Sequence, residues 1–488
     1  MRKLLIFVLA CTVAVAAYAY KTAGDGTLYT FEKLSQIEGT GVTKVNETTY
    51  VVLQTDTIAE GDSLTLDDLK HYGVVRFGDG VGLRIEGVAD LSSWMSVVEY
   101  GGTSAGCRLG SPSDAITFTR NEETDRPFAV TLAGKDTGKE NWVHGVNFEY
   151  IGLRIETEAG VLVTDCWFDR HNGAQSGAVY LGADADIEKE IYHDIDHCNF
   201  THCEKAAIGG AANISGSVGV TYCKFVENSQ LNQNIPQLNL TASKEILIDH
   251  CILEGDSTKN MSGGIGISNF FGTAGNSVKI SNCRVKSHRY GITTMGVMDA
   301  EITDCTLTDN RFEQNPMNGG SGISFYDPYQ QQTAKVSDCL ISGSLWGVTV
   351  IGCKSINLGR TDVGEDDPDY NPGRNIFRDN GFDGQLYDLY NNSTRTVYAQ
   401  NNTWNVSEQT QEQIETVIFH QADDASLGEV VYMPAFAGEQ TGIAGAKSRQ
   451  PLAADGVCDL AGRKVTLPGS AASTRRGVYI VNGRKIIR

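Results

Sequence analysis

The chain has 488 residues, of which 41% are apolar and 20% charged, with 54 glycines and only 10 prolines. This composition is typical of a globular protein and excludes a largely disordered chain, and the length allows two or more ordinary domains or one long repetitive domain. The formal charge of −20 argues against nucleic acid and anionic membranes as partners, because both are themselves negative.

The first 19 residues have the pattern of a secretory leader. "MRK" is a charged start, "LLIFVLACTVAVA" is apolar, and Ala17-Tyr18-Ala19 is an A-x-A cleavage signal. The apolar stretch is too short for a membrane span, and no other segment resembles one, so we expect no membrane-spanning segment. We therefore predict cleavage after Ala19 and a mature protein that is secreted or held at the cell surface.

A short phrase then recurs around cysteine. It reads "VTDCWF", "IDHCNF", "VTYCKF", "IDHCIL", "ISNCRV", "ITDCTL" and "VSDCLI", with cysteines at 166, 198, 223, 251, 283, 305 and 339. A disulfide framework, a metal site or a structural repeat could each produce recurring cysteines. Seven cysteines cannot all pair, and a zinc site would bring them in close pairs. The pattern favours a structural repeat in which cysteine is a small inward-facing apolar residue.

The local pattern around each cysteine indicates the kind of repeat. A short alternating strand precedes it, as in "EILIDHC", and a second strand opened by a small residue follows, as in "GGIGISNF". No helix of useful length fits between them. Two or three short strands per repeat predict a parallel β-helix, in which coils stack at about 4.8 Å and equivalent side chains form ladders.

From about Tyr50 to Phe436 the chain resembles the right-handed parallel β-helix proteins of the pectin-lyase-like superfamily. The cysteine phrases, "NIFRDNGFDGQLYDLY" at 375–390 and the closing segment that begins "NNTWNV" carry the resemblance. It implies an all-β, right-handed parallel β-helix over 20–436, and we expect about nine to eleven coils from the repeat length.

Both ends of such a solenoid need a cap, because an open end would expose apolar side chains and strand edges. We expect a short amphipathic helix within "LYTFEKLSQI" at 28–37 and a capping segment at about 403–436 with a helix from Gln411 to Phe419. Residues 437–454 read as a linker. Residues 455–488 read as a short β tail, which resembles the C-terminal type IX secretion sorting segments of exported Bacteroidetes proteins.

The resemblance implies a function connected with polysaccharides. Enzymes of this fold are mostly polysaccharide lyases and hydrolases, with sites on the outside of the strands and turns. A lyase needs a base and a cation, either Ca²⁺ or Arg/Lys, to stabilise an enolate. A hydrolase needs two or three carboxylates at a spacing set by the stereochemical outcome.

Alignment of the repeats on their cysteines places a line of polar residues four to six positions later. His288 and Arg289 are predicted to lie between Asp256 and Asp309, one coil to either side, and Arg170 with His171 forms a second candidate cluster. Either cluster could supply a base and a cation. The alternative is that these residues are polar only because turns are wet.

Other residues are candidates for binding. Arg311 could extend a basic strip, and Phe270, Phe271 and Tyr326 could stack on sugar rings, although packing is the alternative for the aromatic residues. In the acidic loop "GEDDPDYN", the carboxylates of Asp366, Asp367 and Asp369 are ligands that Ca²⁺ prefers, with a solvated loop as the alternative. Calcium is the one cofactor that the sequence suggests.

We therefore predict an exported or cell-surface β-helix protein that binds a polysaccharide, with cleavage by a lyase or a glycoside hydrolase mechanism as the catalytic form of the hypothesis. The alternative is a non-catalytic adhesin or structural solenoid. Fold alone does not decide between them.

Overall fold

A computed structural model describes residues 19–436 apart from 70–71, 94–114, 137, 183–191, 211–215, 242–243, 270–275 and 314–317, together with 457–458, 478–481 and 484–487. The chain divides into two compact units, Met1–Phe436 and Ala437–Arg488. In the second unit, β43 (Val457–Cys458), β44 (Val478–Val481) and β45 (Arg484–Ile487) form an antiparallel sheet. The predicted leader up to residue 18 and the predicted linker lie outside the described residues.

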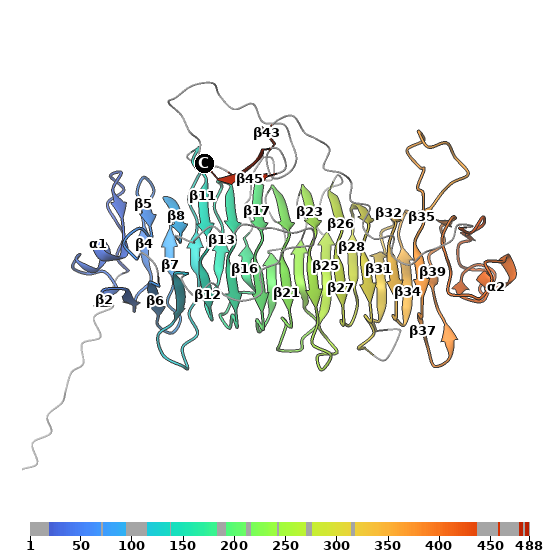
Figure 1. Cartoon of the computed structure of the whole chain (residues 1–488), viewed down its shortest axis with the longest axis horizontal. Helices are drawn as coiled ribbons and strands as arrows, with labels where there is room; N and C mark the ends of the chain where they lie inside the picture. The colour runs from blue at the N-terminus through green and yellow to red at the C-terminus, as the bar shows by residue number, and fades with distance from the viewer. Residues whose placement is uncertain are drawn as a thin grey trace, which may run out of the picture. The chain divides into compact units, whose positions relative to one another are not determined.

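The first unit is a right-handed parallel β-helix, as the sequence predicted, with three long sheets that run along its axis (Figure 1). Sheets A and C have 13 strands each and sheet B has 14. The predicted number of nine to eleven coils was too low, because the coils before residue 160 lack the cysteine that marks the later coils. No helix in the described part of the chain is long and apolar enough to cross a membrane.

The chain passes through the sheets in the order B, C, A in each coil. Sheet B consists of β1 (Leu28–Tyr29), β5 (Ser63–Thr65), β8 (Val88–Ser92), β11 (Asn141–His144), β14 (Val161–Thr164), β17 (Tyr192–Asp196), β20 (Ser217–Thr221), β23 (Glu245–Asp249), β26 (Ser277–Ser281), β29 (Asp299–Thr303), β32 (Thr333–Ser337), β35 (Ser355–Gly359), β40 (Val397–Ala399) and β42 (Val430–Val431).

In the coils from β11 to β33, sheet C follows sheet B after two residues. It consists of β2 (Val42–Asn46), β3 (Thr49–Val52), β6 (Val74–Phe77), β9 (Thr117–Arg120), β12 (Asn147–Glu149), β15 (Trp167–Asp169), β18 (Asn199–Thr201), β21 (Lys224–Val226), β24 (Ile252–Glu254), β27 (Arg284–Lys286), β30 (Thr306–Thr308), β33 (Leu340–Ser342) and β36 (Ile376–Arg378). Its strands are parallel except for the pair β2–β3.

Sheet A completes the coil after a longer connection. It consists of β4 (Asp56–Ile58), β7 (Leu83–Ile85), β10 (Val130–Leu132), β13 (Leu153–Ile155), β16 (Gly177–Leu181), β19 (Ala206–Gly210), β22 (Pro236–Thr241), β25 (Gly263–Asn269), β28 (Ile292–Gly296), β31 (Ser321–Asp327), β34 (Trp346–Gly352), β39 (Leu389–Asn392) and β41 (Ile418–Phe419). A hairpin of β37 (Gly381–Phe382) and β38 (Gln385–Leu386) precedes β39.

The turn from sheet B to sheet C, named here the B–C corner, explains the recurring cysteines. The residue immediately before each cysteine has left-handed backbone geometry, with φ between 52° and 57°. These residues are Asp165, His197, Tyr222, His250, Asn282, Asp304 and Asp338. That residue turns the chain, so its side chain faces outward and the following cysteine faces the interior. All seven cysteines are free and buried, which confirms the inward ladder.

Identical side chains stack inside the solenoid. Phe148, Phe168, Phe200 and Phe225 lie one coil apart, and their ring centroids are separated by 4.7, 4.9 and 5.0 Å with nearly parallel planes. These separations follow the spacing of about 4.8 Å between hydrogen-bonded strands. Each cysteine of the ladder also donates an S–H to a carbonyl of the preceding coil, as Cys166 does to Val143 O at 3.4 Å.

Short helices close both ends. At the first end, α1 (Phe31–Ser35) buries Phe31 and Leu34, and the Thr30 hydroxyl accepts a hydrogen bond from the backbone of Lys33. At the other end, α2 (Gln411–Glu415) is capped in the same way by Thr410 and buries Ile414. Helix α2 is shorter than the expected 411–419, because Ile418 and Phe419 pair with sheet A as β41.

The phenylalanine stack should contribute measurably to stability. Phe200 is fully buried between two parallel rings, so Phe200→Ala leaves a cavity and should lower the free energy of unfolding by about 3–5 kcal/mol. Urea denaturation followed by circular dichroism measures this. Phe382→Ala, at a surface position, is the control and should change stability by less than about 0.5 kcal/mol. Equal effects of both substitutions would contradict the packing argument.

Candidate functional site

The turn from sheet C to sheet A, named here the C–A corner, divides the predicted catalytic line into outward and inward residues. Arg170 and Asp309 have left-handed geometry and face outward. The side chain that follows each such turn points into the interior of the solenoid. In two of the coils this side chain belongs to His171 and to His288. The expectation that both imidazoles line the outer edge is therefore corrected: His171 is 1% exposed and His288 is not exposed at all.

The two interior histidines occupy a buried polar layer. His288 Nε2 lies 2.7 Å from Gln237 Nε2, and the His288 backbone N–H donates to Asn310 Oδ1 at 3.2 Å. Burial lowers the pKa of His288 to about 3, and burial together with Lys205 lowers the pKa of His171 to about 3. Both imidazoles are therefore neutral and enclosed, away from any polymer outside.

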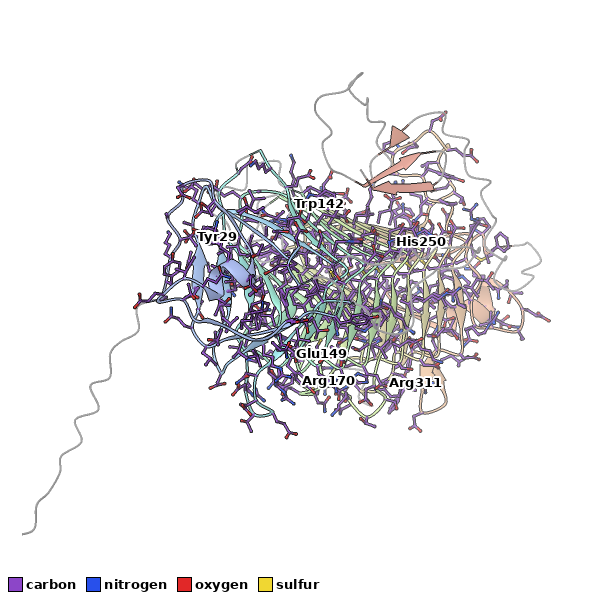
Figure 2. The ribbon with its side chains drawn as sticks, turned by 60° about the vertical axis from the view of Figure 1, so that its left-hand side comes forward. Tyr29, Trp142, Glu149, Arg170, His250 and Arg311 are labelled. Atoms are coloured by element: carbon purple, nitrogen blue, oxygen red, sulfur yellow. The ribbon has the colours of Figure 1, made fainter. Side chains whose placement is uncertain are left out.

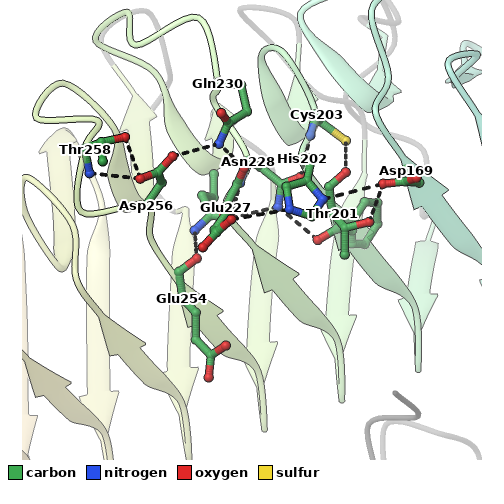
Figure 3. Close-up of polar contacts among 12 residues, drawn as sticks. Asp169, Thr201, His202, Cys203, Glu227, Asn228, Gln230, Glu254, Asp256 and Thr258 are labelled. Carbon is green, nitrogen blue, oxygen red and sulfur yellow. Dashed lines mark hydrogen bonds and ion pairs between the residues drawn. The ribbon is translucent and has the colours of Figure 1, made fainter. Parts of the chain in front are cut away.

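The outer side of the C–A corner carries a line of exposed polar groups (Figure 3). His202 lies between two carboxylates, with Nδ1 3.7 Å from Asp169 Oδ1 and Nε2 3.3 Å from Glu227 Oε2. Its side chain and that of Glu227 are about half exposed. Gln230 links this line to Asp256, which lies 3.4 Å from Gln230 Nε2. Exposed ion pairs of this kind contribute little to stability.

The carboxylates predicted to flank Arg289 do not pair with it. Asp256 Oδ1 accepts hydrogen bonds from the backbone and hydroxyl of Thr258, so it organises its own loop. Burial acts to raise the pKa of Asp256, but these bonds and the one from Gln230 outweigh it and leave the pKa lowered. Among the described residues, no ion pair joins Arg289 to Asp256 or Asp309.

Arg289 instead connects two loops that lead into strands of sheet A. Its Nη1 donates to Asn234 Oδ1 at 2.9 Å, and its Nη2 donates to Asn318 O. The Nε atom is buried without a hydrogen-bond partner in the described structure. No described carboxylate is within ion-pair distance of this guanidinium. Arg289 is therefore a partly buried cation with neutral partners only.

The outer face of sheet A next to Arg289 has an unusual run of small side chains. The in-register positions on successive coils are Gly209, Asn239, Gly266, Thr293, Ser324 and Thr349. We name this run the sheet A ladder. Larger residues continue the register at its two ends, Tyr180 before Gly209 and Tyr390 after Thr349. Asn239 and Ser324 are the partly exposed members of this run, whereas Gly266 is buried beneath the Pro236 ring.

Rings lie along the edge of the sheet A ladder that faces the C–A corner. A Cβ at Gly263 would be 2.2 Å from Tyr290 Cζ, so the Tyr290 ring lies directly on this glycine. Farther along, Trp346 packs on Tyr387 and Tyr390, with centroid separations of 4.0 and 5.0 Å. The predicted sugar-binding residue Tyr326 lies on the outer side of the same sheet and is 38% exposed.

The remaining sequence candidates lie elsewhere. Arg311 is exposed after the C–A corner, and Arg170 forms an ion pair with Asp169 at 2.6 Å. Phe270 and Phe271 lie outside the described residues. Asp366, Asp367 and Asp369 are exposed on their loop, and Asp369 forms an ion pair with Arg360 at 2.7 Å. No group of three or more His, Cys, Asp or Glu able to hold a metal occurs among the described residues.

The B–C corner carries a second candidate site that the sequence analysis missed. The outward turn residues His197, Tyr222 and His250 stack one coil apart, with ring centroids separated by 4.9 and 4.7 Å. Asp196 Oδ2 lies 2.7 Å from His197 Nδ1, and Asp249 Oδ2 lies 2.6 Å from His250 Nδ1. We name these five residues the corner cluster. The signal was in the sequence as "IDHC", which occurs twice with "VTYC" between the two copies.

The Asp249–His250 pair has the geometry of a general base. Asp249 holds Nδ1 of the imidazole, which leaves Nε2 as the nitrogen for proton exchange, and the His250 side chain is 39% exposed. The hydrogen bond with Asp249 raises the pKa of His250, against the opposite effect of burial. Burial acts to raise the pKa of Asp249, but hydrogen bonds with His250, Asn282 and Ser281 leave it lowered.

The carboxylates of the corner cluster also affect the pKa of Tyr222. Burial, followed by the charges of Asp249 and Asp196, raises the pKa of Tyr222, so its hydroxyl stays protonated. The corner cluster is separate from the surface that carries Glu149, Arg170 and Arg311. In Figure 2 these three residues lie toward the lower edge, whereas His250 lies higher up. The corner cluster and the C–A corner are therefore different surfaces of the solenoid.

Comparison with known proteins gives few matches. Neither a protein-family model nor a curated protein matches the chain. Among solved structures, the periplasmic alginate epimerase AlgG is similar over 83% of both chains, with 11% identity and a TM-score of 0.35. A single-site mutant of AlgG gives the same values. At this identity and TM-score the similarity transfers no activity to this chain.

The corner cluster should make stability depend on pH. Because the pKa of His250 is raised on folding, its contribution is complete below the unfolded pKa of about 6.5 and is lost as pH rises through the folded value. The lowered pKa of Asp249 contributes stability above about pH 4, and this is lost as pH falls through the folded value. The stability advantage of the wild type over Asp249→Asn should therefore be larger at pH 5.5 than at pH 8.5.

Urea denaturation midpoints at the two pH values measure this difference. Asp383→Asn, in an exposed loop, is the control and should show no pH-dependent difference from the wild type. An advantage that grows between pH 5.5 and pH 8.5 would contradict the assignment of the Asp249–His250 pair.

Proposed function

We propose that this is an exported protein that binds an acidic polysaccharide along the outer face of sheet A. The observation that carries the proposal is Arg289, a partly buried guanidinium without a described carboxylate partner at the edge of the sheet A ladder. Burying a cation costs free energy unless it is paired. An anionic ligand would supply that partner, and a sugar carboxylate matches the planar fork of arginine.

The repeating geometry supports an extended polymer as the ligand. The sheet A ladder presents one small side chain per coil, at intervals of about 4.8 Å along the axis. Asn239 and Ser324 are partly exposed on this face and offer hydrogen-bonding groups. Tyr326 supplies an exposed ring of the kind that packs on sugars. A linear chain of similar units fits a surface that repeats in this way.

Charge explains why the proposal depends on a local cation. The formal charge of the whole chain is −20, so a polyanion is repelled at long range. Arg289 offsets that repulsion only where its guanidinium is within contact distance. Divalent cations would reduce the same repulsion, so we expect added Ca²⁺ to strengthen binding without a dedicated metal site.

Substitution of Arg289 tests the binding proposal. Arg289→Ala should weaken binding to an acidic polysaccharide by about tenfold to a hundredfold, because it removes a charge-assisted contact. Arg289→Lys should retain part of the affinity, because it keeps the charge but loses the fork. Isothermal titration calorimetry on a panel of acidic and neutral polysaccharides, with and without Ca²⁺, measures both.

Arg284→Ala is the matched control, because Arg284 is an exposed arginine in the same coil as Arg289 but on sheet C, away from the proposed surface. Its affinity should equal that of the wild type. Equal losses in the two alanine variants would indicate a general charge effect and contradict a site at Arg289. Thermal melting of each variant establishes that the loops around residue 289 remain folded.

A specific observation favours cleavage as a second candidate function. The Asp249–His250 pair beside Tyr222 is an arrangement that can remove a proton, which is the first step of a polysaccharide lyase. In this scheme Asp249 orients the imidazole, His250 Nε2 takes the proton next to a sugar carboxylate, and the Tyr222 hydroxyl can protonate the leaving oxygen. The corner cluster lies on a different surface from Arg289, so binding and cleavage are separable by mutation.

His250→Asn tests cleavage with little risk to the fold. Position 250 has left-handed backbone geometry, which asparagine tolerates, and Asn282 already occupies the equivalent turn one coil later. The substitution should reduce unsaturated-product formation by at least about a hundredfold. His202→Asn is the matched control, because His202 has the same backbone geometry and two neighbouring carboxylates at the other corner; its activity should be unchanged.

The pattern of products separates the alternatives. Absorbance of unsaturated ends that depends on His250 supports the lyase. Reducing ends without that absorbance indicate a hydrolase and direct attention to Asp256 and Asp309. Binding without any product across the panel supports the non-catalytic adhesin. The same surface-bound role would suit the tail at 455–488 as a sorting or anchoring segment.

A further inference from the structure

The first residues after the predicted leader extend sheet A at its open end. Lys21 forms a parallel bridge with Thr57 of β4. The Thr57 N–H donates to Tyr20 O at 2.8 Å, and the Thr22 N–H donates to Thr57 O at 3.0 Å. Tyr20 is therefore fixed in place by backbone hydrogen bonds.

A second set of bonds fixes the segment that follows. The carboxylate of Asp62, which is fully buried, accepts hydrogen bonds from the Thr22 hydroxyl at 2.5 Å and from the backbone of Gly24, Gly26 and Thr27 at 2.8–3.1 Å. These contacts leave the segment little freedom to shift along β4. The position of the Tyr20 nitrogen is thus determined from both sides.

The Tyr20 nitrogen faces a carboxylate in the interior. Asp56 is fully buried, and its Oδ1 accepts hydrogen bonds from Tyr20 N at 3.2 Å and from Gln54 Nε2 at 2.7 Å. Its Oδ2 accepts one from Gly41 N at 2.7 Å. No described cation forms an ion pair with Asp56, and the nearby Lys21 pairs with Glu86 at 2.7 Å instead. A buried carboxylate without a cation is unfavourable.

We propose that removal of the leader supplies the missing cation. Hydrolysis of the Ala19–Tyr20 peptide bond by a leader peptidase consumes one water, breaks the C–N bond, and leaves a carboxylate on Ala19 and an ammonium on Tyr20. The nitrogen that donates one hydrogen bond to Asp56 as an amide then becomes an ammonium that pairs with this buried carboxylate. Cleavage at this bond is therefore a maturation step that completes the N-terminal end of the solenoid.

The ion pair with Asp56 forms only if the chain is cut between Ala19 and Tyr20. Cleavage one bond earlier leaves Ala19 in place, so the Tyr20 nitrogen remains a neutral amide. Cleavage one bond later removes Tyr20 and the donor with it. The A-x-A signal at 17–19 and the contact at Asp56 independently point to the same bond.

Matched chains with different N-termini test the proposal. The full chain to residue 488 is released from a fusion by a protease that leaves no extra residue, either with a free amine on Tyr20, with one additional residue (Ala19), or with Tyr20 acetylated. Each is prepared as wild type and as Asp56→Asn, and thermal unfolding is followed by circular dichroism. The extended and acetylated chains retain the hydrogen-bonding nitrogen but carry no charge on it.

The wild-type chain with the free Tyr20 amine should melt at a temperature higher by about 2 °C or more than the extended and acetylated chains. In the Asp56→Asn background the three chains should melt together, because the asparagine has no charge to pair. The exported protein should have Tyr20 as its first residue by intact mass. Equal melting of the three wild-type chains, a difference that persists in Asp56→Asn, or a different first residue would each overturn the proposal.

Discussion

Hydrogen bonding between parallel strands in register is the constraint on which the rest of this structure depends. It places every side chain about 4.8 Å from its equivalent on the next coil, inside and outside alike. Inside, the constraint produces the phenylalanine stack and the cysteine ladder. Outside, it produces the His197–Tyr222–His250 stack and the sheet A ladder. The same spacing thus generates both the core and the two candidate sites.

The fold could be predicted because its main signal repeats. The cysteine phrases mark the inward position of seven coils, and alternating apolar residues mark the strands on either side. The count of coils was less accurate. Before residue 160 other residues, such as Val146, occupy the inward position, and no single residue type marks the turn. A repeat is recognised only where its most distinctive residue is retained.

The sites were harder to predict, because one turn residue decides which side chains face outward. His171 and His288 follow a left-handed residue and enter the core, although their neighbours in sequence are solvated. That change of direction by one position has no clear signature in composition. The corner cluster was missed for a different reason. Its residues precede the cysteines, and the stacking of His197 on Tyr222 becomes apparent only when the coils are aligned in space.

Three carboxylates and one guanidinium that are shielded from solvent differ in the partners that surround them. Asp249 has an imidazole partner, Asp62 is surrounded by hydrogen-bond donors, and Asp56 has neutral donors only. Arg289 is the cationic counterpart of Asp56, since its described partners are neutral amides and carbonyls. An unpaired buried charge is a position where an additional group of opposite sign has the most to contribute. The two proposals of ligand binding and leader removal both rest on this principle.

The cysteine ladder has a consequence for where the protein can fold. Its thiols are unbonded, buried and engaged with backbone carbonyls, so the core does not depend on any sulfur–sulfur bond. Burial also raises the pKa of the neighbouring Cys203 thiol to about 12, which suppresses the reactive thiolate. The seven cysteines of the ladder should therefore contribute equally to stability in a reducing compartment and in an oxidising one.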